Sequence, residues 1–153
     1  MKNFKYKAFT LIELLVVISV ILIIASFLIP NFRSAKNSGR IRKARSDIVR
    51  LENAISLYES DFGVCPPAAT NKALVNYLTS KTLYGSSKRW HGPYIEFKDS
   101  ELKGGAFVDP WGNPYFYRNP GIFNTTFVDI YSFGPDGVNN NGGNDDINNW
   151  TRW

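Results

Sequence analysis

The chain has 153 residues, a formal net charge of +5 and 15% aromatic residues. This length allows one modest domain beside a separate N-terminal segment. The single cysteine, Cys65, excludes an intrachain disulfide, and one further soft ligand, His91, does not complete a tetrahedral zinc site. We expect structural roles for both residues. The sequence contains no nucleophile–base pair and no phosphate-binding glycine loop, so it predicts a protein that is not an enzyme.

An apolar segment dominates the N-terminal part. Phe9 to Ile29 comprises 21 residues, mostly Ile, Leu, Val, Phe and Ala, with one carboxylate, Glu13. A helix of this length spans roughly 30 Å, the thickness of the hydrocarbon core of a bilayer, and it has no polar face. The sequence therefore predicts a transmembrane segment over residues 9–30. Because an unpaired charge is costly in lipid, we expect Glu13 to have a partner.

A second helical pattern follows, over residues 31–62. Pro30 removes one helical hydrogen bond, so we expect a bend or a local opening there. Beyond it, apolar residues recur at spacings of three and four, which is typical of a helix with one buried face. A coiled-coil seam is the alternative, but the aromatic-rich remainder of the chain favours packing on a domain. The apolar stripe consists of Ile41, Ala44, Ile48, Leu51, Ile55, Tyr58 and Phe62.

Positive charge is concentrated at two places. Residues 1–8 carry three lysines, and residues 33–50 carry seven Lys or Arg residues against one acid, Asp47. We interpret the second cluster as a solvated helix face that meets lipid head groups. Nucleic acid is not an expected partner, because no aromatic residues interleave with these charges and no groove-reading motif accompanies them.

The remaining residues, 63–153, predict a globular α+β domain. A short helix is expected at residues 71–79, capped by Thr70 or Asn71, with a surface loop at residues 80–92. Short aromatic or β-branched stretches separated by Gly, Pro and Asn then predict an antiparallel meander with one face on the long helix. These stretches are residues 93–97, 115–118 and 127–133.

Residues 134–150 form a loop rich in Gly, Asn and Asp, with too few apolar residues to be held by burial. Asp136, Asp145 and Asp146 supply carboxylate oxygens, which Ca²⁺ prefers as ligands. Their spacing does not match an EF-hand. From composition alone, a metal site and a plain turn-rich loop are equally open.

Several stretches resemble a known family. The basic leader, residues 1–8, followed by Phe9-Thr10-Leu11-Ile12-Glu13-Leu14, resembles the start of type IV pilins and type II secretion pseudopilins. Residues 46–59, 109–115 and 131–150 look like the major pseudopilin of the type II secretion system. The resemblance implies a type IV pilin-like α+β fold. In that fold a long N-terminal helix, whose first half is membrane-inserted, packs on a small antiparallel sheet with a polar C-terminal loop.

The same resemblance implies roles for residues near the start of the chain. A prepilin peptidase would cut between Ala8 and Phe9 and methylate Phe9, with Ala8 standing where the family usually has Gly. Glu13 would be the assembly residue, paired with the terminal amine of a neighbouring subunit. Pro30 would mark the place where the helix bends or stretches during assembly.

In the C-terminal loop the resemblance implies bound calcium. The side-chain ligands would be Asp136, Asp145 and Asp146, and the backbone carbonyls of Phe133 and Val138 would complete the site. The loop is longer and richer in Asn than is usual in the family, which makes residues 139–141 possible substitutes for Val138.

As a function, the resemblance implies a structural subunit of a periplasmic pseudopilus, anchored in the bacterial inner membrane by a single span. Its partners would be further copies of itself in a helical filament, an inner-membrane assembly platform, minor pseudopilins, the prepilin peptidase and, before assembly, lipid. Two alternatives stay open. One is a type IV pilin for adhesion or DNA uptake that uses the cluster at residues 33–50. The other is a membrane-anchored binding module that never polymerises and keeps residues 1–8.

Overall fold

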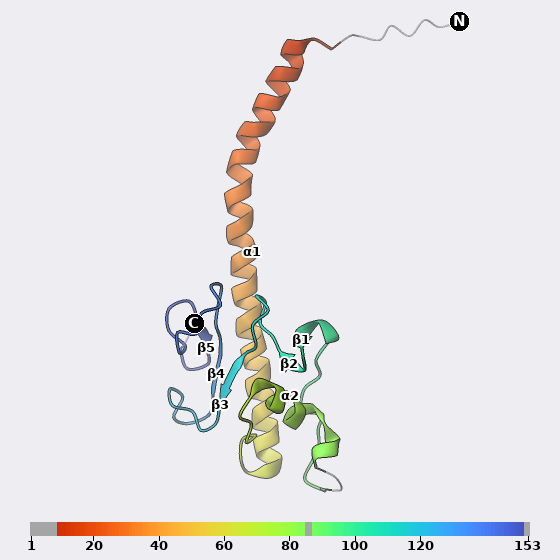
Figure 1. Cartoon of the computed structure of the whole chain (residues 1–153), viewed down its shortest axis with the longest axis vertical. Helices are drawn as coiled ribbons and strands as arrows, with labels where there is room; N and C mark the ends of the chain where they lie inside the picture. The colour runs from red at the N-terminus through yellow and green to blue at the C-terminus, as the bar shows by residue number, and fades with distance from the viewer. Residues whose placement is uncertain (1–8, 85–86, 152–153) are drawn as a thin grey trace, which may run out of the picture. The chain divides into compact units, whose positions relative to one another are not determined.

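The computed structural model describes residues 9–84 and 87–151, without the side chains of residues 28–33. Helix α1 runs from Leu11 to Phe62 (Figure 1). The chain forms two compact units, Met1–Ser38 and Gly39–Trp153, so that α1 contributes to both.

In the first unit, α1 carries apolar side chains on all its faces. The large apolar side chains described between Phe9 and Phe27 are 46% to 82% exposed. The hydroxyls of Ser19 and Ser26 donate back to carbonyls one turn earlier, at 2.8 Å and 2.7 Å, so both polar groups are satisfied within the helix. Within residues 9–84 and 87–151, we find no helix with both the length and the apolarity needed to cross a membrane.

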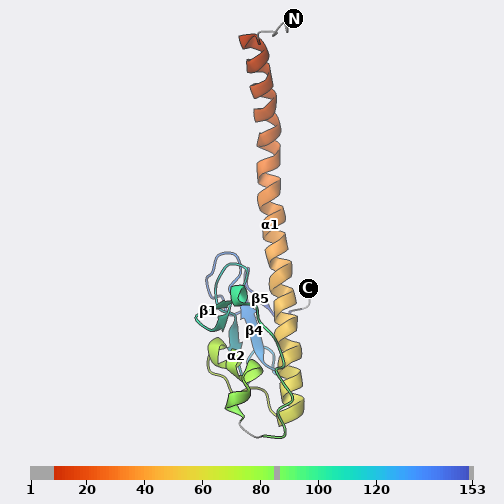
Figure 2. The same cartoon turned by 90° about the vertical axis from the view of Figure 1, so that its right-hand side faces the viewer.

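The second unit contains the remaining elements (Figures 1 and 2). Helix α2 spans Asn71–Thr79, and two short 3₁₀ helices, η1 and η2, span Lys81–Leu83 and Asp99–Glu101. Strands β1 and β2 pair in an antiparallel hairpin, and β3, β4 and β5 form a three-stranded antiparallel sheet in that order. The strands are β1 Leu102–Lys103, β2 Ala106–Phe107, β3 Phe116–Arg118, β4 Asp129–Ser132 and β5 Ile147–Asn148.

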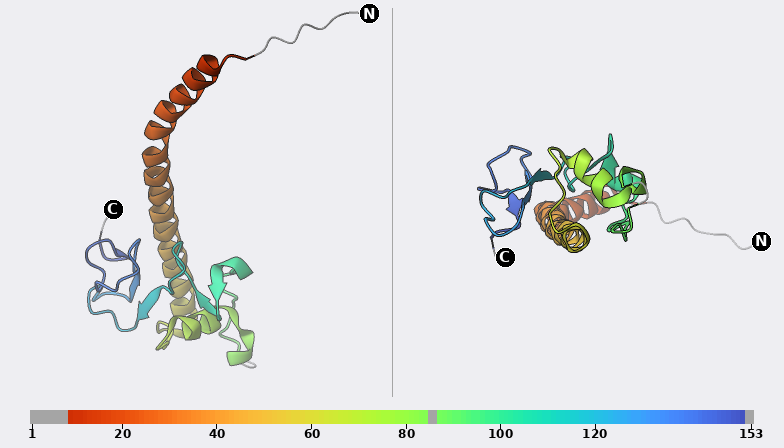
Figure 3. Two further views of the ribbon diagram at one scale, coloured as in Figure 1. Left: turned by 45° about the horizontal axis from the view of Figure 1, so that its top comes forward. Right: turned by 90° about the horizontal axis from the view of Figure 1, so that it is seen from below.

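The core of this unit lies along one face of α1. In Figure 2, α2, β1, β4 and β5 all lie on the same side of this part of the helix, and Figure 3 shows the blue C-terminal strands and the green and teal elements spread to either side across that face. Stripe residues from Ala44 to Tyr58 are at most 4% exposed, whereas Ile41 and Phe62 at its ends are half-buried. The predicted buried face of α1 is therefore confirmed. It packs with the buried residues Leu74, Leu78, Phe107, Tyr115, Tyr117, Ile130 and Ile147.

Helix α2 confirms the prediction for residues 71–79, and the Thr70 hydroxyl caps it by accepting a hydrogen bond from Ala73 N at 3.2 Å. Strands β3 and β4 confirm the predictions at 115–118 and 127–133, with shorter bounds. The strand predicted at 93–97 is wrong, because Tyr94 N donates to Leu78 O at the end of α2 instead of to a neighbouring strand.

Two strand pairings were not predicted. Gly104 and Gly105 both have positive φ, +60° and +85°, as a two-residue hairpin turn requires, but the flanking strands are too short to show periodicity. Strand β5 lies inside the stretch predicted as a polar loop, because buried Ile147 pairs with β4. The single predicted meander is therefore two separate sheets.

Candidate functional site

The first predicted site is the start of α1. The Thr10 hydroxyl accepts a hydrogen bond from Glu13 N at 3.3 Å, and the Glu13 carboxylate accepts from Thr10 N at 3.0 Å and from the Thr10 hydroxyl at 2.7 Å. This reciprocal arrangement is a capping box, which satisfies backbone N–H groups at a helix start. Phe9 is 71% exposed beside it. Ala8 lies outside the described residues.

Other residues of the predicted assembly segment are described only in part. Helix α1 continues through Pro30, whose side chain is not described, so the bend expected there stays a prediction. Glu13 lies beside a shallow apolar depression lined by Phe9, Ile12, Val16 and Val17. The side chain expected to pair with a neighbouring subunit is therefore accessible and surrounded by apolar groups.

The second predicted site is the C-terminal loop, where Asp146 is the most buried of the three aspartates. One of its oxygens, Oδ2, accepts hydrogen bonds from Asn140 N at 3.0 Å and Gly142 N at 2.8 Å. The other, Oδ1, is buried without a hydrogen-bond partner in the described part of the chain. Burial raises the pKa of Asp146, the two N–H donors lower it, and the nearby carboxylates of Asp145 and Asp136 raise it further.

The other two aspartates are tied to the loop backbone. Asp145 Oδ2 accepts a hydrogen bond from Asp136 N at 3.2 Å, and Asp136 Oδ1 accepts one from Val138 N at 2.8 Å. The carbonyl of Val138, a predicted calcium ligand, accepts a hydrogen bond from the Asn140 side chain at 3.1 Å. Phe133, the other predicted carbonyl ligand, directly follows β4.

The possible ligands in this loop suit a hard cation, because they are oxygen atoms. One of them, the buried Oδ1 of Asp146, receives no hydrogen bond from the described residues. Asp146 also lines a cavity of about 300 Å³ together with Arg45, Asn148 and Thr151. In the described ranges, no three Asp, Glu, His or Cys side chains are grouped closely enough to hold an ion. A bound ion would therefore need the carboxylates to draw together.

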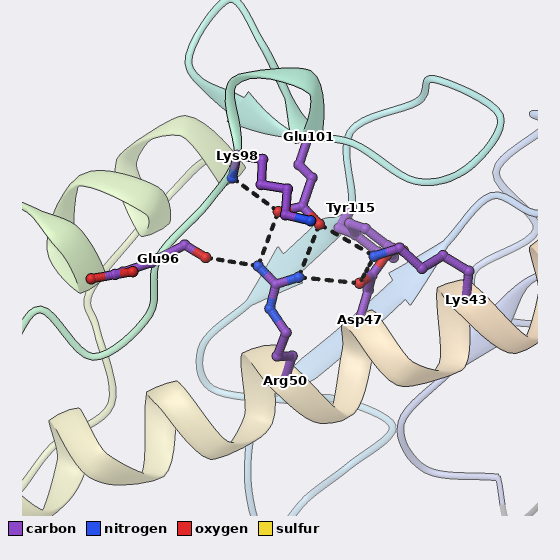
Figure 4. A network of polar contacts seen from close by, with 7 residues as sticks. All are labelled: Lys43, Asp47, Arg50, Glu96, Lys98, Glu101 and Tyr115. Atoms are coloured by element: carbon purple, nitrogen blue, oxygen red, sulfur yellow. Dashed lines mark hydrogen bonds and ion pairs between the residues drawn. The ribbon is translucent and has the colours of Figure 1, made fainter.

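A third polar cluster was not predicted (Figure 4). Arg50 on α1 forms two hydrogen bonds with the Glu101 carboxylate, at 3.0 Å and 3.2 Å, and a third with the carbonyl of Glu96 at 2.9 Å. The hydrogen bond from Arg50 is the main reason that the pKa of Glu101 is lowered to about 2. The cluster thus fastens the η2–β1 region to α1.

Asp47 connects this cluster to the core. It is 2% exposed, forms an ion pair with Lys43 one turn earlier, and accepts a hydrogen bond from the Tyr115 hydroxyl at 3.2 Å. Burial raises the pKa of Tyr115 far above its usual value, and the charge of Asp47 adds to this effect. The signal in the sequence was that Asp47 is the only acid among the basic residues 33–50 and lies on the buried face of the helix.

Comparisons with known proteins match this architecture over nearly the whole chain. Residues 31–150 match the family model described as type II secretion system (T2SS), protein G, and residues 3–29 match the prokaryotic N-terminal methylation motif. The type II secretion system core protein G of Escherichia coli K12 is 38% identical, with 95% of this chain and 92% of that protein covered. The protein of the same name from Aeromonas hydrophila is 38% identical over 98% of this chain and 96% of that protein.

A solved structure agrees with these relatives. The crystal structure of the major pseudopilin from the type 2 secretion system of enterohaemorrhagic Escherichia coli has 32% sequence identity and a TM-score of 0.54, covering 76% of this chain and 87% of that one. The predicted pilin-like α+β fold is thereby confirmed. The chain belongs to the protein G family of the type II secretion system, whose members are the structural subunits of the pseudopilus.

Proposed function

We propose that this chain is held in the bacterial inner membrane by a single span, residues 9–30, with its second unit in the periplasm, until it is assembled into the pseudopilus. One observation carries the proposal. The described side chains of the apolar segment are exposed on all faces of α1, around a single carboxylate at its start. Such a surface needs either lipid or other apolar helices to cover it.

The N-terminal motif supports a defined order of events. A prepilin peptidase removes residues 1–8, methylates Phe9 and so creates a new amine at the start of α1. The amine of one subunit then pairs with Glu13 of its neighbour. In an apolar surrounding an unpaired carboxylate is costly, so pairing removes that cost and fixes the axial register of the two helices. The assembly platform and minor pseudopilins are the expected partners of this step.

Two substitutions at Glu13 separate charge pairing from helix capping. Both Glu and Gln can complete a capping box, whereas Ala cannot. We expect Glu13→Gln to keep the capped start of α1 but to form no filaments. We expect Glu13→Ala to lose the cap and to form no filaments either. The measurement is electron microscopy of filaments sheared from cells that contain the secretion machinery, with the precursor quantified in the membrane fraction. Normal filaments from Glu13→Gln would contradict the pairing.

We further propose that the C-terminal loop binds Ca²⁺ through Asp136, Asp145 and Asp146. Two observations support this assignment. No group in the described part of the chain donates a hydrogen bond to the buried Oδ1 of Asp146, and the possible ligands of the loop are oxygen atoms. When bound, the ion would supply positive charge that offsets the mutual repulsion of the three carboxylates. Between Gly134 and Asp146 the only large apolar side chain is Val138, which is 56% exposed, so burial contributes little to the order of this stretch.

Thermal unfolding tests the calcium proposal. For the full chain in detergent, we expect Ca²⁺ at 100 times its dissociation constant to stabilise the fold by about 2.7 kcal/mol, and a chelator to remove that gain. Asp146→Asn should abolish the response to Ca²⁺, while Asp99→Asn on exposed η2 should preserve it. A melting temperature that changes neither with Ca²⁺ nor with chelator would refute the site.

DNA uptake has less support from the geometry of the basic cluster. Lys43 is paired with Asp47, and Arg50 with Asp47 and Glu101, so these two charges serve the fold. Salt-sensitive retention of DNA by the purified chain would support that alternative.

A further inference from the structure

The turn at residues 109–113 encloses a buried carboxylate. Asp109, at its start, is 4% exposed. Its Oδ1 accepts hydrogen bonds from Trp111 N at 3.0 Å and Asn113 N at 2.9 Å, and its backbone N–H donates to Asn113 O at 2.8 Å. The carboxylate therefore closes the turn from within. We call residues 109–113 the Asp109 turn.

The Asp109 turn is anchored in the core at both ends. Tyr115 N donates to Phe107 O at 3.1 Å, and the two buried rings stack with centroids 4.9 Å apart. Val108 and Pro114 form a further antiparallel bridge next to the turn. The turn therefore stands on a rigid base, from which it can hold a neighbouring segment in place.

Two hydrogen bonds connect this turn to the start of the C-terminal loop. Ser132, which is 0% exposed, donates its hydroxyl to the second oxygen of Asp109, Oδ2, at 2.6 Å and accepts a hydrogen bond from Gly134 N at 3.1 Å. An ionised carboxylate can only accept, so the hydroxyl proton points to Asp109 and a lone pair of Oγ is left for Gly134 N. Asp109 thereby sets the direction of both hydrogen bonds.

These hydrogen bonds fix the peptide unit between Phe133 and Gly134. The unit is planar, so its N–H and the Phe133 carbonyl point in opposite directions. Because Ser132 holds the N–H, the carbonyl is held in one direction as well. Phe133 supplies one of the two backbone carbonyls predicted as calcium ligands. The orientation of that carbonyl is thus set by residues outside the loop.

Two glycines allow the loop to pack closely at this place. Gly134 has a φ of +65°, and a Cβ on it would collide with the carbonyl oxygen of Asp145. Gly137 has a φ of +70°, and a Cβ on it would lie 3.1 Å from the side-chain nitrogen of Asn113. The segment between the two glycines carries Asp136. It therefore meets Asp145 at one end and the turn at the other.

We propose that the Asp109 turn is a positioning element for the calcium site: through Ser132 and Asn113 it fixes the Phe133 carbonyl and the backbone around Asp136. This inference rests on the proposed calcium binding and assigns a role to residues that are not themselves ligands. Among the described residues, no three candidate side chains are grouped for an ion, so the carboxylates have to move when it enters. A backbone that is already fixed leaves less to be ordered in that step, which strengthens binding.

A role in positioning differs measurably from a role in stability. A turn that only stabilised the fold would change the melting temperature and leave the affinity of the folded chain for Ca²⁺ unchanged. A positioning turn changes the affinity itself. Groups that orient metal ligands without touching the metal typically change metal affinity by roughly 10–100-fold. The dissociation constant of the folded chain therefore separates the two roles.

Calorimetric titration of the full chain in detergent with CaCl₂ measures that constant. Ser132→Ala removes the hydroxyl, and so both hydrogen bonds, without changing a predicted ligand. We expect its dissociation constant for Ca²⁺ to rise by about tenfold or more. Tyr117→Phe, on the neighbouring strand, is the matched control, because it also removes one buried hydroxyl, which donates to Pro66 O at 2.7 Å. It should bind Ca²⁺ as tightly as the parent chain.

Asn113→Ala tests the second contact while keeping the fold. The side chain is only half-buried, and the backbone groups of residue 113 that close the turn stay in place. We expect the dissociation constant to rise, though less than in Ser132→Ala, with little change in melting temperature. If Ser132→Ala does not fold, this variant decides alone, and an unchanged dissociation constant overturns the inference.

Hydrogen exchange in the absence of Ca²⁺ gives a second readout. Asp136 N donates to Asp145 Oδ2 and Val138 N donates to Asp136 Oδ1, and neither hydrogen bond involves Ser132. We expect both amides to exchange faster in Ser132→Ala than in the parent chain, and at the parent rate in Tyr117→Phe. Equal rates in Ser132→Ala and the parent chain would contradict the positioning role.

The outcomes separate this inference from the proposed function. If the parent chain binds Ca²⁺ and Ser132→Ala binds it equally well, the calcium site stands and the inference is wrong. If Tyr117→Phe loses as much affinity as Ser132→Ala, the inference is also wrong, because affinity then follows overall stability. If the parent chain binds no Ca²⁺, the proposed site fails first and the positioning role falls with it.

Discussion

Arg50 and Glu101 form a two-pronged ion pair that joins the C-terminal part of α1 to the 3₁₀ helix before β1. The two nitrogen–oxygen distances are 3.0 Å and 3.2 Å. Their side chains are 35% and 16% exposed, so water screens the pair only in part. Because a guanidinium and a carboxylate match in two hydrogen bonds, the pair fixes direction as well as distance.

We predict that Glu101→Gln destabilises the fold by about 1 kcal/mol at neutral pH, a value discounted for partial exposure. The hydrogen bond from Arg50, with smaller contributions from Lys98 N and Lys43, lowers the pKa of Glu101 from 4.5 to about 2. The stabilisation by the Glu101 carboxylate is therefore complete above pH 4.5 and is lost as pH falls towards 2. Urea unfolding between pH 7 and pH 2 should therefore show the two proteins converging in acid. Glu96→Gln is the matched control, because only the backbone carbonyl of Glu96 meets Arg50.

Asn71 joins α2 to the strands through its buried amide. Its Nδ2 donates to Tyr115 O at 2.8 Å and its Oδ1 accepts from Phe107 N at 2.6 Å. Asn71→Ala leaves both backbone groups buried without partners, and we expect a loss of about 2–4 kcal/mol. Asn76→Ala, on the exposed face of α2, should change the unfolding free energy by less than about 0.5 kcal/mol. Equal effects in chemical denaturation would contradict the bridging role.

Asp129 is predicted to set the conformation of the loop at residues 121–124, because its buried carboxylate accepts hydrogen bonds from the backbone N–H groups of Ile122, Phe123 and Asn124. In Asp129→Asn, one carboxylate oxygen is replaced by an NH₂ group, which cannot accept a hydrogen bond from a backbone N–H. At least one buried hydrogen bond is therefore lost. We expect a destabilisation of about 2 kcal/mol and faster hydrogen exchange at Ile122, Phe123 and Asn124. Unchanged exchange at these three amides would show that other contacts hold the loop.

Gly142 and Gly112 both have positive φ, at +79° and +93°, but only Gly142 is crowded. A Cβ on Gly142 would collide with the Trp150 ring, whereas one on Gly112 would meet nothing within 4 Å. In both Ala variants the left-handed backbone lowers the free energy of unfolding by roughly 1–2 kcal/mol. Gly142→Ala should cost about 1–3 kcal/mol more, because the ring has to move. The fluorescence of the unfolding transition would measure the difference.

The sequence was most informative where one local signal was sufficient. The stripe from Ala44 to Tyr58 repeats often enough to define the buried face of α1. Helix α2 has a Thr70 cap and ends at the predicted residue. In both cases neighbours three or four positions apart determine the structure, and such spacings can be read directly.

The polar contacts were less predictable because they join residues distant in sequence. Glu101 lies 51 positions after Arg50, and Tyr115 lies 68 positions after Asp47. Strands of two residues, such as β1 and β5, are too short to show an alternating pattern. The stretch at residues 93–97 is rich in aromatic and β-branched residues, as strands are, but the backbone N–H of Tyr94 donates to the end of α2, which only the tertiary structure reveals.

Asn149 contacts Glu52 on α1 and the backbone of both Val128 and Ile130, so a residue near the C-terminus is bonded to one that lies 97 positions earlier. During synthesis the apolar face of α1 is made long before the strands that cover it. Closing loops of this length is slow compared with forming a helical turn. The apolar face of α1 in the newly made chain therefore stays exposed, and accessible to chaperones, until β4 and β5 have been synthesised. Only then can the domain complete its fold.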